Sequence, residues 1–257
     1  MASHATPENF ASKLLSCLGL RPPFLMEKIA QPLGLEIRSR NTTGFEATLV
    51  RNPHGAGGII ATGGVVRGFN RQRFTIAHEL GHYVLSTDQE PTVCLSKDLQ
   101  LWNPSILAEE RAANRFATEL LLPAKHVAPI VIDRGVSIET ANYVKNSFVT
   151  SLTTAAFRCA ELSFETCAVV YIVDGIVKNY LPSKSWGYRI FTGCPVSKST
   201  MAAKLLENGS GLTQCGRVNA MAWADGSKFM DFPAEFFEDS IHLRSYKTIL
   251  SLLTEVG

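Results

Sequence analysis

The N-terminal part of the chain carries two helical patterns followed by three extended ones. Apolar residues recur at helical spacing over 7–18 and 23–33, and a glycine, a residue that commonly ends helices, directly follows each stretch. Extended patterns with turn residues between them then predict strands at 35–38, 46–51 and 58–61. We expect these strands to form a small antiparallel sheet.

Two longer helical patterns follow the expected sheet. One covers about 70–85, and the other covers about 105–122 between Pro104 and Pro123, because proline disrupts the interior of a helix. Weaker helical patterns come next, at 138–145 and 150–162.

The C-terminal part changes to hairpin patterns. Two Asp-Gly dipeptides each lie between strand-length runs, as in tight hairpin turns. The four expected strands are 167–173, 176–181, 219–224 and 228–232. A helix is expected between the hairpins, at 197–206. The chain is therefore predicted to be an α+β protein, with a first domain over 1–135 and a smaller mixed helix and β-hairpin region over 136–257.

The helix expected over 70–85 contains two histidines four residues apart. His78 and His82 would lie on one face of that helix, so both imidazoles can bind one metal ion. Glu79 follows the first histidine, where a carboxylate can remove a proton from water that the ion activates. Two imidazoles with one carboxylate suit Zn²⁺ best, and this donor set also accommodates Mn²⁺ or Fe²⁺.

The helix expected over 105–122 supplies a third metal ligand, as catalytic zinc usually needs. Glu110 and Asn114 share one face of this helix, beside the small Ala113. Glu110 is the predicted ligand, and Asn114 is predicted to bind the second nitrogen of a ligand histidine. Glu109 is the alternative ligand, which we disfavour because the residue four positions further along is the apolar Ala113.

Composition narrows the class of protein only slightly. The 257 residues include 25 Lys and Arg and 23 Asp and Glu, and this net charge of +2 is too small to indicate a nucleic-acid-binding surface. The N-terminus lacks the apolar core of a signal peptide, and no apolar run is as long as a membrane span. Six scattered cysteines fit a reducing compartment. We therefore expect a cytoplasmic protein without a membrane partner.

Two further roles stay open at this level. The donor that would stabilise the oxyanion formed during peptide hydrolysis has three candidates, Arg115, His126 and Tyr143. Basic residues before the metal motif would either guide an acidic substrate segment or form an ordinary solvated face, and they are Arg51, Arg67, Arg71 and Arg73.

Three segments of the sequence resemble the ImmA/IrrE family of bacterial and phage metallopeptidases. They are RFTIAHELGHY at 73–83, ERAANRFA at 110–117 and LLLP at 120–123. With the pattern of short helices and strands before them, the resemblance covers roughly residues 10–125. It fades after about residue 165.

The resemblance implies a zincin-like catalytic domain of the gluzincin type. Glu79 would be its catalytic base, and its metal ligands would be His78, His82 and Glu110. Members of this family cleave helix-turn-helix transcriptional repressors, often encoded beside them, and so induce mobile-element or stress-response genes. A helix-turn-helix repressor is therefore the expected protein substrate of this metalloendopeptidase.

Two alternatives belong to other functional classes. The first is a regulator that keeps the metal for stability or sensing and binds a repressor or DNA without cutting a peptide bond, although every expected catalytic position is present. The second is DNA binding through the segment 150–162. The sequence disfavours direct nucleic-acid binding, because only Lys145 and Arg158 supply basic charge near that segment.

Overall fold

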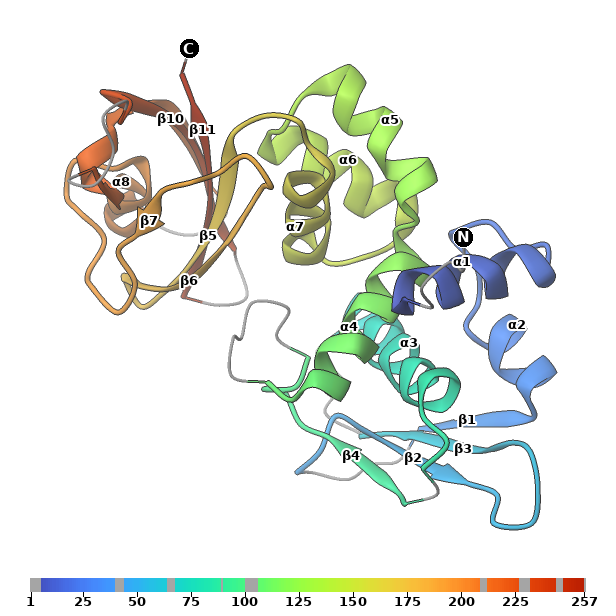
Figure 1. The fold of residues 1–257 in the computed structure, drawn as a ribbon. Helices are drawn as coiled ribbons and strands as arrows, with labels where there is room; N and C mark the ends of the chain where they lie inside the picture. The colour runs from blue at the N-terminus through green and yellow to red at the C-terminus, as the bar shows by residue number, and fades with distance from the viewer. Residues whose placement is uncertain are drawn as a thin grey trace. The chain divides into compact units, whose positions relative to one another are not determined.

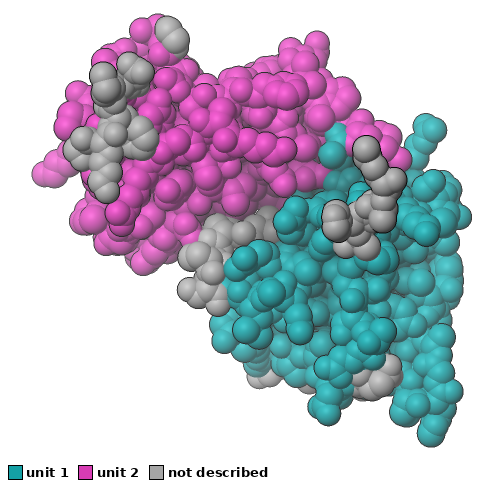
Figure 2. Space-filling model, viewed as in Figure 1, with its two compact units in different colours: residues 1–124, 145–151 teal, residues 125–144, 152–257 magenta. Residues whose placement is uncertain are grey.

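The chain divides into two compact units in this computed structural model (Figures 1 and 2). Unit 1 comprises residues 1–124 and 145–151, and unit 2 comprises residues 125–144 and 152–257. The structure describes residues 6–39, 44–63, 68–88, 90–99, 106–208, 212–226, 232–243 and 247–256. The predicted α+β class is confirmed, because helices with a small sheet are followed by a part rich in strands. The domain boundary expected after residue 135 stays a prediction.

Unit 1 packs helices against a four-stranded sheet (Figure 1). Its helices are α1 (Pro7–Cys17), α2 (Glu27–Ala30), the 3₁₀ helix η1 (Gln31–Leu33), α3 (Phe69–Leu85) and α4 (Ala108–Leu121). Its strands are β1 (Leu35–Ser39), β2 (Ala47–Arg51), β3 (Gly58–Thr62) and β4 (Thr92–Cys94).

The sheet of unit 1 is mixed, whereas an antiparallel sheet was predicted. Its order is β1-β3-β2-β4, so β3 lies between the two strands that precede it in the chain. β2 runs antiparallel to both β3 and β4, but β1 runs parallel to β3. The prediction was wrong on this point because it assumed that strands adjacent in sequence are adjacent in the sheet.

The helix predicted over 23–33 is shorter than expected. Helical structure starts only at Glu27, and the last turn, Gln31–Leu33, is a 3₁₀ helix. Pro32 has no backbone N–H to donate to an α-helical hydrogen bond, which accounts for the change of helix type. Gly34 then ends the segment in the left-handed conformation, with φ of 73°.

The metal motif lies on the most deeply buried helix of unit 1. Residues 73–82 of α3 are all buried, and α3 packs against α4 on one side and against β2 and β3 of the sheet on the other. Apolar side chains from α1, α3, α4 and the sheet form one core, which includes Leu15, Leu49, Ile60, Leu80 and Phe116. The two helices that carry the predicted site are therefore held by a common core.

Unit 2 combines helices with a five-stranded antiparallel sheet. Its helices are α5 (Ala124–Arg134), α6 (Ile138–Phe148), α7 (Leu152–Leu162), α8 (Met201–Asn208) and the 3₁₀ helix η2 (Ala220–Ala222). The first residue of α5 and the end of α6 from Lys145 belong to unit 1. Its strands are β5 (Cys167–Val173), β6 (Ile176–Pro182), β7 (Arg189–Ile190), β8 (Thr213–Asn219), β9 (Ala224–Asp225), β10 (Glu235–Leu243) and β11 (Thr248–Glu255). Sequence patterns did not predict α5, which contains Pro129.

The sheet order of unit 2 is β6-β5-β11-β10-β8, with α8 packed on β8, β10 and β11 (Figure 1). Apolar side chains between α8 and the sheet form a second core, which includes Trp186, Leu205, Trp223, Phe236 and Ile249. None of the helices in the described part of the chain is long and apolar enough to cross a membrane.

Of the two predicted hairpins, the first is confirmed. β5 and β6 pair antiparallel, and the turn residues Asp174 and Gly175 both have positive φ. The second hairpin is wrong in its described part, because the strand expected at 219–224 is instead the end of β8, η2 and β9. Asn219 accepts a hydrogen bond from the Met221 N–H and so starts the 3₁₀ helix η2. Residues 228–231 of the second expected strand, 228–232, lie outside the described residues.

Two consecutive carboxylates of β10 bind the N-termini of two helices. The Glu238 carboxylate accepts hydrogen bonds from the backbone N–H groups of Met201 and Ala202, at the start of α8. The Asp239 carboxylate accepts one from Ile138 N–H, at the start of α6. Because successive side chains of a strand point to opposite faces, the pair joins the sheet to one helix on each face.

Candidate metal centre

Three side chains from two helices converge at one point of unit 1. His78 Nε2 lies 3.0 Å from Glu110 Oε2, and His82 Nε2 lies 3.3 Å from the same oxygen. The two Nε2 atoms lie 3.0 Å apart. His78 and His82 are separated by one turn of α3, and Glu110 comes from the first turn of α4. The structure thus brings together the three residues that the sequence singled out as ligands.

The spacing of these three atoms fits a tetrahedral metal ion. With bonds of about 2.0–2.1 Å, two ligand atoms on zinc lie about 3.3 Å apart. The three distances in the cluster, 3.0, 3.0 and 3.3 Å, are close to that value. Glu109, the alternative ligand, is exposed and outside the group of described residues that could hold an ion with these histidines.

Charge in the cluster favours a cation. Burial acts to raise the pKa of Glu110, but its hydrogen bonds to His78 and His82 outweigh burial and lower that pKa to about 2. Burial acts to lower the pKa of His82, but the hydrogen bond to Glu110 outweighs it and raises that pKa. Both shifts have the same cause: the negative charge of Glu110 and the positive charge of a protonated His82 stabilise each other. A divalent ion would supply that charge permanently.

Asn114 fixes which nitrogen of His78 faces the cluster. Its Nδ2 donates to the backbone carbonyl of Asp98 at 2.7 Å, and this acceptor sets the orientation of the amide. Its Oδ1 therefore faces His78 Nδ1, at 2.9 Å, and accepts a hydrogen bond from it. With Nδ1 protonated, the lone pair of a neutral His78 lies on Nε2, which points at Glu110 and His82.

Glu79 lies beside the cluster but is not part of the group formed by His78, His82 and Glu110. Its side chain is fully buried, and its Oε2 accepts a hydrogen bond from the Thr92 hydroxyl at 3.0 Å. Its Oε1 is buried and has no hydrogen-bond partner among the described residues. Burial raises the pKa of Glu79, while the two histidines and Thr92 act to lower it. A buried carboxylate with one unpaired oxygen is suited to accept a proton.

A close contact between α3 and α4 sets the distance from the histidines to Glu110. A Cβ added to Gly81 would lie 3.0 Å from Ala113 Cα and 3.3 Å from Ala113 Cβ. Only small residues at both positions allow the helices to approach this closely, since larger side chains would push the backbones apart. Gly81 is thus a structural part of the metal motif.

Arg51 on β2 holds the end of α3. Its Nη2 donates to the backbone carbonyls of His82 and Ser86, each at 2.8 Å, and to Tyr83 at 3.2 Å. The guanidinium carbon also lies 4.8 Å from the centroid of the Tyr83 ring. Backbone carbonyls at a helix C-terminus carry partial negative charge, so this contact stabilises the turn that contains His82.

Arginines near the metal motif are therefore engaged within the protein. Arg71 binds both carboxylate oxygens of Glu46, at 2.8 and 3.1 Å, and Arg73 is buried and donates to the backbone carbonyl of Phe24. Arg67 lies outside the described residues. Neither alternative left open by the sequence fits Arg51, Arg71 and Arg73. Their side chains bind other groups of the protein, so they are neither a solvated face nor free to guide an acidic substrate segment.

Each of the three oxyanion-donor candidates either has another described partner or belongs to unit 2. Arg115 forms an ion pair with Glu8. His126 and Tyr143 belong to unit 2, and the Tyr143 ring lies 4.4 Å from the guanidinium carbon of Arg134. Sequence analysis missed two residues of the site, Thr92, which binds Glu79, and Asp98, which binds Asn114. Helical periodicity could not indicate either of them, because neither lies on α3 or α4.

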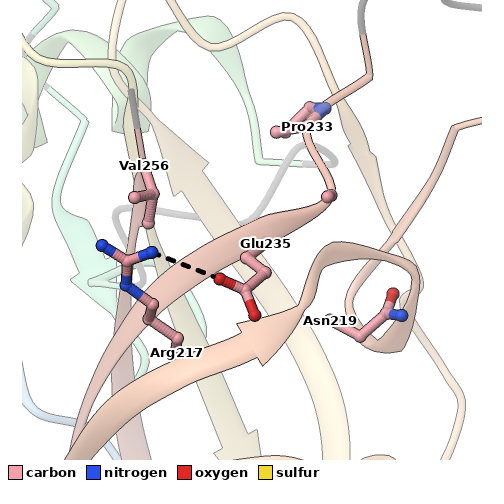
Figure 3. Close-up of a pocket in the computed structure, with 6 residues that line it drawn as sticks. Arg217, Asn219, Pro233, Glu235 and Val256 are labelled. Atoms are coloured by element: carbon pink, nitrogen blue, oxygen red, sulfur yellow. Dashed lines mark ion pairs between the residues drawn. The ribbon is translucent and has the colours of Figure 1, made fainter.

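A separate hollow lies in unit 2, beside the end of β8 and the start of β10 (Figure 3). It has a volume of about 420 Å³ and includes Arg217 and Glu235, which form an exposed ion pair at 3.5 Å. The opposite charges of this pair offset each other, and the lining residues include no histidine or cysteine. The hollow therefore offers fewer side chains that could bind a metal ion than the cluster in unit 1 does.

Two comparisons with known proteins found a similar family domain and a similar fold. Residues 69–159 match the family model of the IrrE N-terminal-like domain, Peptidase_M78. A solved structure described as a Mycobacterium tuberculosis transcriptional regulator is similar over 96% of this chain and 74% of that chain, with a TM-score of 0.60. Sequence identity to it is 13%, so the likeness concerns the fold alone. No curated protein matches the chain.

The matched region contains the whole of α3 and α4, and therefore every residue of the cluster. The resemblance seen in the sequence is confirmed at the level of this domain. Residues 69–159 of the chain are thus similar to the IrrE N-terminal-like domain of this peptidase family.

Proposed function

We propose that this chain is a zinc-dependent endopeptidase whose metal ligands are His78, His82 and Glu110. The observation that carries this proposal is the convergence of two histidine Nε2 atoms on one Glu110 oxygen, at 3.0 and 3.3 Å. The match to a peptidase family over residues 69–159 supports hydrolysis as the reaction. Zn²⁺ suits two imidazoles and a carboxylate best, and Mn²⁺ and Fe²⁺ are the alternative ions.

Glu79 is the proposed catalytic base. A zinc ion held by His78, His82 and Glu110 would supply Lewis acidity for the attacking water and the carbonyl of the scissile bond. Because Thr92 holds Oε2 of Glu79, Oε1 is the oxygen that takes the proton from the attacking water. The same oxygen then delivers the proton to the leaving nitrogen. Burial raises the pKa of Glu79 and so strengthens it as a proton acceptor.

The proposed substrate is a helix-turn-helix transcriptional repressor in the cytoplasm of a bacterium or in a phage-infected cell. The basis is the sequence resemblance to the ImmA/IrrE family, whose members cut such repressors. Cleavage at one site would separate the repressor's DNA-binding part from the rest and derepress stress-response or mobile-element genes. Unit 2 is the proposed region for sensing or substrate binding.

The competing DNA-binding role finds no support in α7. Eight of its residues are buried, including Arg158, whose guanidinium binds Glu161 at 2.7 Å. A helix that reads a DNA groove must present its side chains to solvent. The Glu79→Gln variant distinguishes the peptidase from the other alternative, a metal-containing regulator that does not cut a peptide bond.

The test is cleavage of purified repressors by the full chain loaded with Zn²⁺. Helix-turn-helix repressors encoded near its gene are incubated with the protein, with and without a chelator, and fragments are identified by mass spectrometry. We expect one chelator-sensitive cut. Glu79→Gln should lower the cleavage rate by about 10²–10⁴-fold, because an amide cannot accept the proton, while the zinc content stays the same.

The ligand assignment is tested on the same preparation. Glu110→Gln should lose most of its zinc at a chelator concentration that leaves the unchanged protein loaded, whereas the matched control Glu109→Gln should keep it. If Glu79→Gln still releases a repressor from its operator in cells, the protein is a regulator that binds without cutting. If the protein cuts none of these repressors, the substrate proposal is wrong and the substrate belongs to another class of protein.

A further inference from the structure

Cys94 brings a thiol to the proposed catalytic base. It is the last residue of β4, and its Sγ lies within 4.8 Å of a carboxylate oxygen of Glu79 and of a ring nitrogen of His78. All three side chains are buried. A thiol, a carboxylate and an imidazole at this spacing form a donor set for a divalent ion that binds sulfur well. The group lies beside the proposed zinc ligands and shares only His78 with them.

The second observation is the unpaired oxygen of Glu79. Oε1 is buried and lacks a hydrogen-bond partner among the described residues, although the Glu79 side chain has an exposed fraction of 0%. A buried carboxylate oxygen without a partner costs free energy, which a cation would recover. The thiol of Cys94 makes only a long contact, 3.7 Å to the backbone carbonyl of Leu95. Both groups are thus available to a ligand.

We propose that Cys94 and Glu79 form a second cation position, which takes a thiophilic divalent ion and blocks the catalytic base. On binding, the Cys94 thiol releases its proton to solvent and the thiolate coordinates the ion, while Glu79 Oε1 becomes the second protein ligand. In the zinc-loaded protein His78 already uses Nε2 for zinc and Nδ1 for Asn114. Solvent therefore completes the shell of the second ion.

The consequence for activity rests on the proposed function of Glu79. With both its oxygens engaged, one by Thr92 and one by the ion, Glu79 has no site left for the proton of the attacking water. Excess Zn²⁺ or a softer ion such as Cd²⁺ would then inhibit cleavage while the first zinc stays bound. A small buried hydrophobe at the edge of the core is the competing role of Cys94.

The probe is Cd²⁺, whose bonds to thiolates absorb in the ultraviolet. Exposed thiols would bind it too, so the parent protein carries serine in place of the three exposed cysteines, Cys17, Cys194 and Cys215. This full-length, zinc-loaded parent is titrated with Cd²⁺. Thiolate absorption, bound zinc and bound cadmium are recorded, and cleavage is measured separately.

We expect one Cd²⁺ to bind per chain, with thiolate absorption and without loss of zinc. Cys94→Ser in this parent should abolish the absorption and weaken Cd²⁺ binding by more than the roughly 10–100-fold that loss of an outer-shell contact costs. The matched control is Cys159→Ser, which changes another buried thiol and should bind Cd²⁺ like the parent. Glu79→Gln keeps the thiol and should retain the absorption with weaker binding.

Three results would overturn the proposal. They are the lack of thiolate absorption in the parent, absorption that persists in Cys94→Ser, and release of one zinc for each cadmium bound, which means exchange at the first site. Thermal unfolding shows whether Cys94→Ser is folded, and Cys94→Ala replaces it if not. Because binding is read without a substrate, a chain that cuts no repressor still tests the second cation position.

Discussion

Asn114 lies outside the three proposed metal ligands but holds one of them, His78, in place. Its amide is oriented by the Asp98 carbonyl, and its Oδ1 holds the proton of His78 on Nδ1. In an Asn114→Ala variant His78 can rotate or change tautomer, so a part of its population no longer presents an Nε2 lone pair. We expect the zinc affinity to fall by about 10–100-fold, measured by competition with a chromophoric chelator.

The matched control for this prediction is Arg115→Ala. Arg115 is the next residue of α4, but its side chain is 59% exposed and binds Glu8 rather than the cluster. Its zinc affinity should equal that of the unchanged protein. Asn114→Asp keeps an oxygen that accepts from His78 Nδ1 and should lose less affinity than Asn114→Ala. Equal affinity in all of these variants would mean that Asn114 does not orient His78.

Glu238 plays a comparable role in unit 2, where it binds four donors. Its carboxylate accepts from the N–H groups of Met201 and Ala202, the Trp223 indole at 2.9 Å and the Ser240 hydroxyl at 2.8 Å. In Glu238→Gln the amide NH₂ would face donors instead of accepting from them. We expect the free energy of unfolding of unit 2 to fall by about 2 kcal/mol, since buried donors lose their acceptor.

Urea denaturation of Trp102→Phe proteins, followed by tryptophan fluorescence, measures this loss, because the remaining Trp186 and Trp223 both belong to the core of unit 2. Glu235→Gln is the control, since that carboxylate lies on the same strand but is exposed. Its midpoint should shift little, as exposed ion pairs contribute about 0–1 kcal/mol. A Glu238→Gln protein as stable as Glu235→Gln would contradict the assigned role of the buried carboxylate.

The pKa of Glu238 also predicts a dependence of stability on pH. Burial raises this pKa above the ordinary value of 4.5, although the four donors oppose the shift. The folded protein therefore binds the Glu238 proton more tightly than the unfolded chain does. This contribution to stability is fully present below about pH 4.5 and is lost as the pH rises through the folded pKa. Glu238→Gln should remove that part of the pH dependence, measured by urea midpoints across pH.

Which residues the sequence could identify depended on helical periodicity. His78 and His82 recur one turn apart, and so do Glu110 and Asn114, so their common faces could be predicted from spacing alone. Thr92, Cys94 and Arg51 reach the site through the pairing of β2 with β4 and the packing of β2 on α3. Strand register and packing are long-range properties, and no local pattern of the sequence encodes them.

At the scale of elements, the contact between Gly81 on α3 and Ala113 on α4 sets the geometry of the cluster. Ala113→Val adds two methyl groups where the helices already touch, so α4 must move away from α3 and carry Glu110 with it. We expect zinc affinity to fall by at least about tenfold and stability of unit 1 to fall by about 1–3 kcal/mol. Chelator competition and thermal unfolding measure the two effects.

Ala112→Val is the matched control for this helix contact. Ala112 precedes Ala113 on α4 but is only partly buried, so its added methyl groups meet fewer neighbours. Its zinc affinity should stay within about threefold of the unchanged protein, because valine there lowers only helix propensity. If Ala113→Val binds zinc as tightly as Ala112→Val does, the helix contact does not position Glu110.

Helices were predicted well where local spacing is helical, and a strand was missed where its place in the sheet depends on distant pairing. α1, α3 and α4 have clear amphipathic spacing, and α7 has a weaker helical pattern. All four were predicted with ends that differ from the structure by a few residues. β11 was missed because six consecutive residues are buried, so its sequence does not alternate. Its neighbours β5 and β10 cover both of its edges, and a continuous apolar run does not distinguish such a central strand from a buried helix.

At the scale of the whole molecule, each unit has its own hydrophobic core, and the three proposed metal ligands lie in unit 1. A ligand that binds the folded state stabilises the part of the protein that forms its site. Zinc at about 1,000 times its Kd would add about 4 kcal/mol to the stability of unit 1. We therefore expect a chelator to lower the unfolding temperature of unit 1 and to leave that of unit 2 nearly unchanged.

Differential scanning calorimetry with and without chelator measures this difference. Tryptophan fluorescence of a Trp102→Phe protein, in which only Trp186 and Trp223 remain, assigns one transition to unit 2. Glu110→Gln should unfold at the same temperature with or without chelator, since it has little zinc to lose. Unit 1 of Glu79→Gln should still respond, because Glu79 lies outside the three proposed ligands. If the chelator shifts both transitions equally, the two cores unfold as one cooperative block. If it shifts neither, the cluster does not hold an ion that stabilises the fold.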